Sequence, residues 1–215
     1  IEGCVANSAS IDFDIDGIAT ISWSGFGKII KDESDLAVGE NEEGAPTPTI
    51  AEAITSTSNF IRNRLTSLTA SSALSGSNIS YDLVLTGGNI TFENNITFLT
   101  PETLGVVNQP LGHVTGTRAI SGNFTCYLNT DTNSSADLFE DIIEATTTIT
   151  NSFNLSFSIG GSAAPKVVIA LPQCHLEVPT HSIDDVISIE ANFHALPSTI
   201  SGTDEATITY TGTAY

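Results

Sequence analysis

The chain has 215 residues, of which 40% are hydrophobic and 14% are charged, so it can bury the core of one large domain or two small ones. It carries 25 acidic and 6 basic residues, a formal net charge of -19 at pH 7. Such a surface repels nucleic-acid phosphates and anionic membranes, which excludes an ordinary DNA-binding module. No run approaches the roughly 18 apolar residues of a membrane-spanning helix.

The first predicted element is a β-hairpin within residues 11–23, IDFDIDGIATISW. Three apolar side chains alternate with three acidic ones: Ile11, Phe13 and Ile15 with Asp12, Asp14 and Asp16. Period-two alternation puts the apolar set on the core face and the carboxylates on the opposite face. The Asp16-Gly17 pair predicts a tight turn between the two strands, because glycine tolerates the positive φ of such turns.

The same aspartates, followed by Gly17, match the first half of a calcium-binding EF-hand loop. The match ends at Trp23, where that loop needs a bidentate glutamate, and both flanks have strand alternation instead of helices. The carboxylate face therefore meets solvent, a cation or an aqueous lumen. Register alone does not distinguish these three environments.

Residues 31–49 are rich in acids, Gly and Pro and predict an extended loop. The next segment, 50–68, fits either a helix or a strand that carries Arg62 and Arg64. These arginines are 2 of the 6 basic residues, and they are either plain surface residues or partners for acids of a neighbouring subunit. The acids of the loop are further inter-subunit candidates: Asp32, Glu33, Asp35, Glu40, Glu42 and Glu43.

The rest of the chain alternates mostly with period two. Residues 79–86, 89–92 and 96–99 predict a three-stranded meander with turns at 87–88 and 94–95. Further strands are predicted at 116–128, 153–159, 165–171, 187–193 and 206–210. One helix is predicted from the spacing of Leu138, Phe139, Ile142 and Ile143, with Ser134 and Asp137 placed to form its N-cap. The predicted fold class is mainly β with one short helix.

Three cysteines, Cys4, Cys126 and Cys174, are an odd number far apart, which predicts buried free thiols. A zinc site would need Cys174, His175 and His181, but adjacent strand residues point to opposite faces. No catalytic motif is present, so we predict no enzyme, no metal and no cofactor. Six Asn-x-Ser/Thr triplets leave a secreted or surface β-sandwich protein, such as a pilin or an adhesin, as the alternative.

Three long blocks carry a resemblance: residues 10–28 (SIDFDIDGIATISWSGFGK), residues 85–129 (beginning LTGGNITFENNITFL) and residues 187–197 (ISIEANFHALP). They are similar to the tail tube, or major tail, proteins of long-tailed bacteriophages. The resemblance implies one β-sandwich domain over residues 1–215, whose strands join neighbouring subunits into a ring-shaped β-barrel. Because the sequence begins at Ile1 and contains no Met, we expect an N-terminal portion to be missing.

The resemblance also implies a virion protein that assembles in the host bacterial cytoplasm. Rings, usually of six copies, would stack into a tube that conducts viral DNA without binding it specifically and without inserting into a membrane. Other tail proteins, such as the tape measure and the tail terminator, would be its partners. Asp12, Asp14 and Asp16 are then the candidates for the channel lining, although an outward-facing sheet satisfies the same register.

Overall fold

The computed structural model describes residues 1, 3–28, 61–72, 78–99, 112–144, 153–183 and 187–212. This part is mainly β, and every strand pair is antiparallel. The strands are β1 Val5–Phe13, β2 Ile21–Phe26, β3 Ser67–Ser72, β4 Ile79–Leu83, β5 Leu85–Glu93, β6 Ile96–Leu99, β7 Gly112–Thr115, β8 Ala119–Tyr127, β9 Phe153–Ile159, β10 Lys166–Leu176, β11 Thr180–Ile183, β12 Ile187–Ala195 and β13 Thr207–Thr211. The helices are α1, Ser135–Glu144, and a short 3₁₀ helix, Asn63–Leu65.

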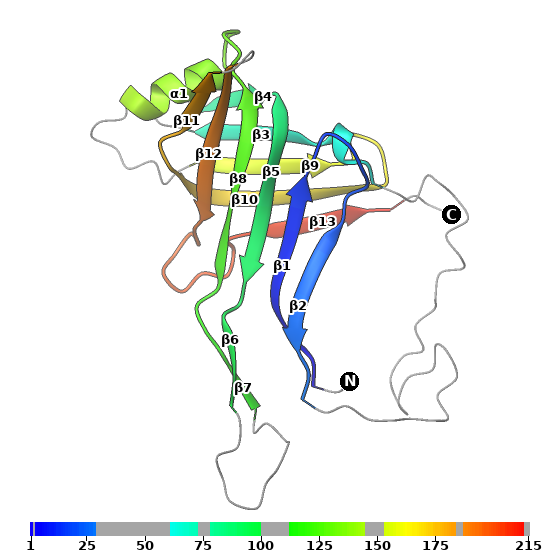
Figure 1. Ribbon diagram of the computed structural model, residues 1–215. Coiled ribbons are helices and arrows are strands. Elements are labelled where there is room, and N and C mark those ends of the chain that lie inside the picture. Colours follow the sequence, from blue (N-terminus) through cyan, green and yellow to red (C-terminus); the bar gives the residue numbers. More distant parts are fainter. Residues whose placement is uncertain are drawn as a thin grey trace, which may run out of the picture.

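One 11-stranded sheet folds over on itself into two layers whose strands cross (Figure 1). The front layer has the order β2-β1-β5-β8-β12, with β11 beside β12. The back layer has the order β10-β9-β3-β4, with β13 on the other side of β10. The mainly β prediction is therefore confirmed, as a single sheet folded into two layers.

The two layers share strand β10. Its first part, residues 166–171, pairs with β9 and β13 in the back layer, whereas residues 174–176 pair with β12 in the front layer. The register shifts between Leu171 and Cys174, around Pro172. Proline has no N–H to donate, so it fits the bulge at which the strand passes from one layer to the other.

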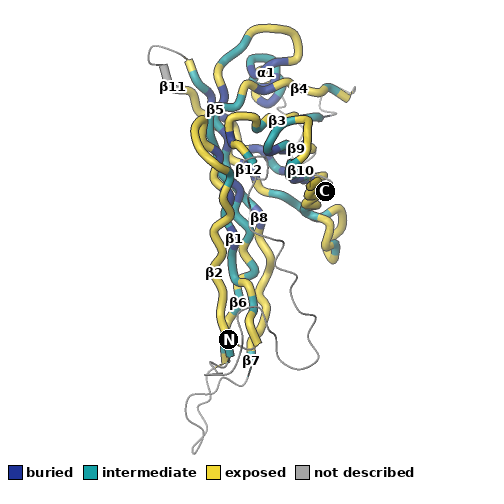
Figure 2. Tube along the Cα trace, turned by 90° about the vertical axis from the view of Figure 1, so that its right-hand side faces the viewer, coloured by how far each residue is buried: buried dark blue, intermediate teal, exposed yellow. Residues whose placement is uncertain are grey.

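The core lies where the layers overlap, as the dark blue segments of Figure 2 show. Alternate side chains of β9 fill it, and Phe153, Leu155 and Phe157 are fully buried. Phe157 stacks on Phe13 of β1 with ring centroids 5.3 Å apart. The layers are therefore held together mainly by buried aromatic and aliphatic side chains, the dominant stabilising term in folding.

Helix α1 covers β4 at the top of the molecule (Figure 1). Leu138 and Ile142 are buried beneath it, and the Tyr81 hydroxyl donates a hydrogen bond to Asp141 Oδ2. At its start, Asn133 N–H donates to Asp137 Oδ2 at 2.6 Å, as expected of an acidic residue in the first turn. The predicted helix is confirmed. Ser134 does occupy the N-cap position, since its carbonyl accepts a hydrogen bond from Leu138 N–H at 3.0 Å, while its hydroxyl donates to the Asn129 carbonyl.

A second, two-stranded sheet of β6 and β7 extends the β5–β8 pair beyond the back layer (Figures 1 and 2). Asn7 of β1 connects this small sheet to the front layer, because Asn7 Oδ1 accepts a hydrogen bond from Ile96 N–H at the start of β6, at 2.8 Å. Phe98 of β6 packs against Phe26 of β2, with centroids 5.3 Å apart. The front layer and this extension therefore form one continuous elongated face.

The structure corrects the predicted N-terminal hairpin. β1 and β2 do pair, but their last partners are Ile11 and Ile21, so the connection is longer than an Asp-Gly turn. Ile15 lies in this connection and is 48% exposed, which contradicts its predicted place in the core. The connection pairs instead with the ambiguous segment, since Ala19 N–H donates to the Ile61 carbonyl at 2.8 Å. The described part of that segment, residues 61–68, is the 3₁₀ helix and the start of β3.

The predicted meander is also wrong. β4 pairs with β3, β5 lies between β1 and β8, and β6 pairs with β7. Gly87 and Gly88 are not a turn but a bulged part of β5, where the register with β8 shifts. Gly88 has φ 148°, and a Cβ there would lie 2.4 Å from the Asn123 carbonyl oxygen. Glycine is needed because the two strands approach closely at a positive φ.

Candidate functional site: the polar face of the front layer

The outer face of the front layer is built mainly from polar residues. In β1, β5, β8 and β12, each buried apolar residue alternates with a polar one that points away from the core. We call this set the polar face: Ser10, Asp12, Asn89, Thr91, Ser121, Asn123, Thr125, Glu190, Asn192 and His194. Each of the four strands has nine residues, so the face is about 30 Å long along the strands.

Two rows cross the sheet in register. In the first row, Asp12 pairs with Asn89, Asn89 with Asn123, and Asn123 with Asn192. In the second row the residues are Ser22, Ser10, Thr91, Ser121 and His194. Cross-strand neighbours of this kind have their Cβ atoms about 5 Å apart, so their side chains form continuous polar bands.

Side-chain amides hold the carboxylates of this face in place. Asn123 Nδ2 donates to Glu190 Oε1 at 3.2 Å, and Asn192 Nδ2 donates to Glu177 Oε2 at 2.9 Å. His194 Nε2 lies 3.7 Å from Glu177 Oε1. Neutral amides satisfy the carboxylate oxygens without cancelling their charge, so the face remains anionic.

Lysine and arginine are absent from β1, β2, β5, β8 and β12, whereas acids stand at Asp12, Glu93 and Glu190. Arg118, just before β8, forms an ion pair with Glu205. A surface without lysine or arginine lacks the charged phosphate contacts that dominate DNA binding, while hydroxyl and amide groups keep it hydrated. The polar face can therefore lie next to nucleic acid while staying hydrated and without binding the phosphates tightly.

Among the described strands, β2 is the last one on its side of the front layer, so its outer edge is open there. All six of its residues, ISWSGF, are exposed, including Trp23 at 68% and Phe26 at 43%. Natural edge strands are usually protected by Lys, Pro or a covering element, and the β2 sequence has none of these residues. The edge is therefore a surface on which another strand can pair.

The three predicted aspartates do not share one environment. Asp12 lies on the polar face of β1, opposite the buried Ile11 and Phe13. Asp14 and Asp16 lie beyond the end of β1, in the exposed connection to β2. The alternation therefore predicted the orientation of Asp12, and it failed where the strand ended.

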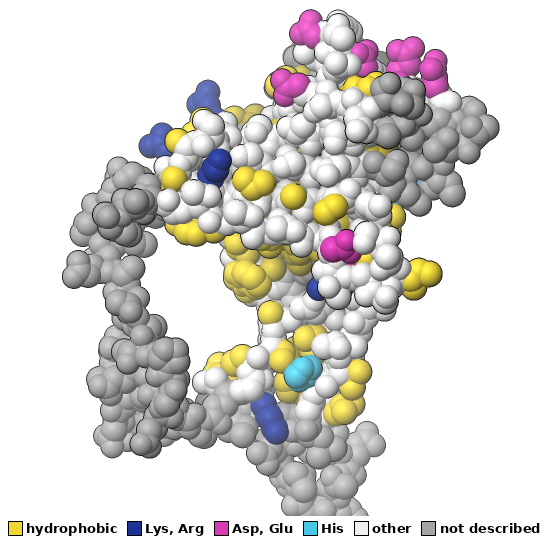
Figure 3. Space-filling view, turned by 180° about the vertical axis from the view of Figure 1, so that it is seen from behind, with side chains coloured by type: hydrophobic (Ala, Val, Ile, Leu, Met, Phe, Trp, Pro, Cys, Tyr) yellow, Lys and Arg dark blue, Asp and Glu magenta, His cyan; other side chains and the backbone are white. Residues whose placement is uncertain are grey.

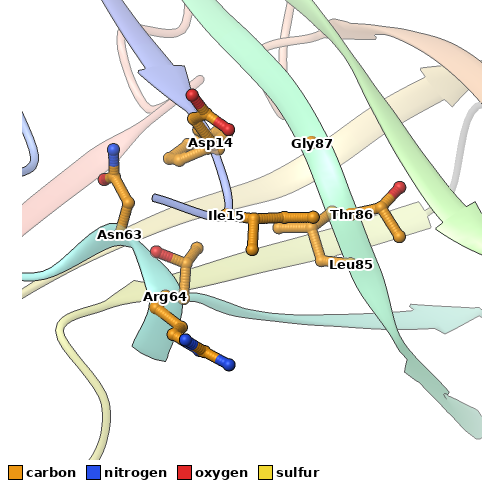
Figure 4. Close-up of a pocket in the computed structure, with 9 residues that line it drawn as sticks. Asp14, Ile15, Asn63, Arg64, Leu85, Thr86 and Gly87 are labelled. Carbon is orange, nitrogen blue, oxygen red and sulfur yellow. The ribbon is translucent and has the colours of Figure 1, made fainter. Parts of the chain in front are cut away.

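Asp14 borders a small cavity of about 80 Å³ together with Asn63, Arg64 and Thr66. The Asp14 carboxylate and the Arg64 guanidinium point away from each other (Figure 4), and the described residues contain no ion pair between them. Asn63 Oδ1 and Thr66 Oγ1 are buried in the structure without a hydrogen-bond partner. Arg62 and Arg64 are both exposed. The acidic inter-subunit candidates between Asp32 and Glu43 lie outside the described residues.

The described residues contain no group of three or more His, Cys, Asp or Glu placed to hold a metal ion. Cys126 and Cys174 are buried, as predicted, but Cys4 is exposed, which contradicts that prediction for one of the three. Burial raises the pKa of the Cys126 thiol to about 11 and that of Cys174 to about 12. Among the described helices, none is long and apolar enough to cross a membrane.

Two comparisons with known proteins agree with this arrangement. The chain belongs to the phage tail tube protein family, whose model matches residues 1–214. It is 32% identical over 208 residues to the tail tube protein pb6 of Escherichia phage T5, a match that covers 95% of this chain and 44% of that relative. The chain therefore spans less than half the length of pb6. The family is one of structural virion proteins, which favours the tail interpretation over a pilin or an adhesin.

Proposed function

We propose that this chain self-assembles into rings of six copies and that the rings stack into a tube that conducts viral DNA. The polar face lines the channel of this tube. The family and the relative named above support a tail tube role, and the polar face is the single observation in this chain that favours conduction.

The polar face favours conduction for an electrostatic reason. DNA carries one negative charge per about 1.7 Å of helix axis, and each lysine or arginine that pairs with a phosphate adds to binding. A channel wall that presents hydroxyls, amides, carboxylates and the His194 imidazole, but no lysine or arginine, leaves the phosphates hydrated and mobile. The outer side of the back layer is also polar, with Asp82, Thr69 and Ser156 in one row, but cations lie at its end, at Lys166 of β10 and at Arg64 of the adjacent 3₁₀ helix.

The open edges explain how a ring closes. In the described part, the front layer ends at β2 on one side and at β11 on the other. Pairing β2 of one copy with β11 of the next makes the front layers of all copies one closed barrel, and it removes the exposed edge. Stacking of such rings is a heterologous contact that does not close, so it produces a filament.

In this assembly Asp12 lies on the channel wall, and Asp14 and Asp16 lie at one end of it, beyond the last residue of β1. The tape measure and tail terminator proteins are the expected partners at the inside and the end of the tube. Assembly takes place in the host bacterial cytoplasm.

Lysines placed on the polar face test the proposal. The test variant is Asp12→Lys with Asn192→Lys, since both residues are exposed on the polar face. The control is Thr69→Lys, which adds a cation at an exposed position on the outer side of β3 in the back layer. The variants are purified for negative-stain microscopy and are also introduced into the phage, where the rate of DNA ejection is measured.

We expect both proteins to form tubes of normal width and only the double variant to slow ejection, because its new cations bind passing phosphates. Wild-type protein that stays monomeric at high concentration contradicts self-assembly. Equal ejection rates for the wild type and the double variant contradict the channel position of the polar face.

A further inference from the structure

Charges of opposite sign gather on different parts of the surface. Seen from behind, dark blue Lys and Arg side chains cluster at one upper end of the back layer, whereas magenta acids cluster over the top and towards the other end (Figure 3). The chain has 6 basic residues, of which Lys31 is not described, and three of the five described ones are Arg62, Arg64 and Lys166. Half of the basic residues of the chain therefore lie at one end, where Asp14 borders a small cavity with Arg64, while other acids lie over the top and the opposite end.

The basic end is a compact patch. The 3₁₀ helix with Arg64 and Leu65 contacts the end of β9, and a Cβ on Gly161 there would lie 3.4 Å from Leu65 Cβ. A Cβ on the adjacent Gly160 would lie 2.9 Å from Ile61 Cγ2 and 3.4 Å from Lys166 Cα. Leu65 is 55% exposed among these cations. We call Arg62, Arg64, Leu65 and Lys166 the basic patch.

The acidic end includes one face of α1. Glu140, Ile143 and Glu144 are exposed and stand at i, i+3 and i+4, so they share a face of the helix, and Ile143 is 50% exposed. We call these three residues the helix patch. The neighbouring acids of α1 already have partners, since Asp137 bonds to Asn133 N–H and Asp141 to the Tyr81 hydroxyl.

The negative charges of the helix patch destabilise α1 in the isolated subunit. The last turn of α1 holds no basic residue, although the negative end of the helix dipole favours cations there. Glu140 and Glu144 are also like charges four residues apart, which destabilises a helix. A cation supplied from outside the helix relieves both effects.

We propose that the basic patch of one copy docks on the helix patch of a second copy. Each patch combines an exposed aliphatic residue, Leu65 or Ile143, with two exposed charges of one sign, Arg62 and Arg64 in one patch and Glu140 and Glu144 in the other, and the signs are opposite. The contact is heterologous, because each copy offers both patches and uses them on different neighbours, as a ring or a filament requires. This inference rests on the proposed self-assembly and names the residues that direct it.

Mixing two charge-reversed variants tests the proposal. One variant is Arg62→Glu with Arg64→Glu, and the other is Glu140→Lys with Glu144→Lys. All four residues are exposed, so both proteins should fold, which melting curves and circular dichroism check. Alone, each variant meets like charge at the contact, and we expect the concentration needed for assembly to rise about tenfold. Mixed in equal amounts, the variants are complementary at every contact, so assembly returns with the two chains alternating.

The controls identify the partner and separate this proposal from the proposed function. A third variant, Glu42→Lys with Glu43→Lys, tests the acids of the 31–49 segment as the alternative partner of the arginines. Rescue of the arginine variant by this third variant, and not by the α1 variant, overturns the proposal. Unimpaired assembly of the single-patch variants overturns it as well, while leaving self-assembly standing. Failure of the wild-type protein to assemble overturns both proposals together.

Discussion

Gly122, in the middle of β8, is the position at which we expect the smallest side-chain addition to have the largest effect. A Cβ at Gly122 would lie 2.0 Å from the Asn89 carbonyl oxygen of β5 and 2.7 Å from the Phe193 ring of β12. Real Cβ atoms essentially never come closer than 3.0 Å, so the first contact is 1.0 Å too short (3.0 − 2.0). Phe193 is fully buried and cannot swing away, and Asn89 belongs to a strand hydrogen-bonded to β8.

Gly122→Ala must therefore push β5 and β8 apart or displace a core ring. Overpacking of this kind costs about 2 kcal/mol or more. For a chain of this size, a loss of about 2 kcal/mol lowers the melting temperature by about 4–8 °C. Thermal unfolding followed by circular dichroism measures the shift.

Gly112→Ala is the matched control, because Gly112 is also in a strand and a Cβ there would meet nothing within 4 Å. We expect it to be neutral, or more stable by about 0.5 kcal/mol because the unfolded chain loses freedom. Equal melting temperatures for the Gly122 and Gly112 variants would refute the close approach of β5 and β8.

Two further predictions concern titratable groups. Tyr81→Phe removes the hydrogen bond to Asp141 and should cost about 1–2 kcal/mol in urea unfolding at pH 8. Burial, and then Asp141, raises the pKa of Tyr81 above its ordinary value near 10, so its contribution to stability is present below pH 10 and falls at higher pH. The variant should therefore lose less stability than the wild type between pH 9 and pH 11, and an equal loss would contradict this. For the thiols, a maleimide at pH 8 should label the exposed Cys4 quickly and reach Cys126 and Cys174 only after unfolding, and rapid labelling of all three would show that the core opens.

Strand alternation predicted the strands whose two faces meet different environments. The alternating apolar residues Phe153, Leu155 and Phe157 of the predicted 153–159 strand are buried, and so are Ile189 and Phe193 of the 187–193 strand, whereas Ile187 is exposed. The outward direction of Asp12 followed from the same rule, because Ile11 and Phe13 had to be inside.

Which strands pair with one another could not be predicted from the alternation of apolar and polar residues. The row from Asp12 through Asn89 and Asn123 to Asn192 joins four strands that are far apart in sequence, and alternation fixes the face of a strand but not its neighbour. The two glycines at 87–88 have the composition of a turn, yet they allow β5 to approach β8 closely. This requirement for glycine can be seen only once the neighbouring strand is known. The polar residues of each strand were visible in the sequence, but their union into one face was not.

Strand β10 has a mechanical consequence. Residues 166–171 belong to the back layer and residues 174–176 to the front layer, so a continuous backbone, besides packed side chains, connects the layers. Lys166 of the basic patch is the first residue of β10, and the other end of β10 pairs with β12, which carries part of the polar face. Because a peptide chain is nearly inextensible, the two layers cannot move apart at this strand, and a displacement of the back layer is passed to β12 through it. In the proposed ring, outer contacts between subunits would thereby act on the wall strands of the channel through β10.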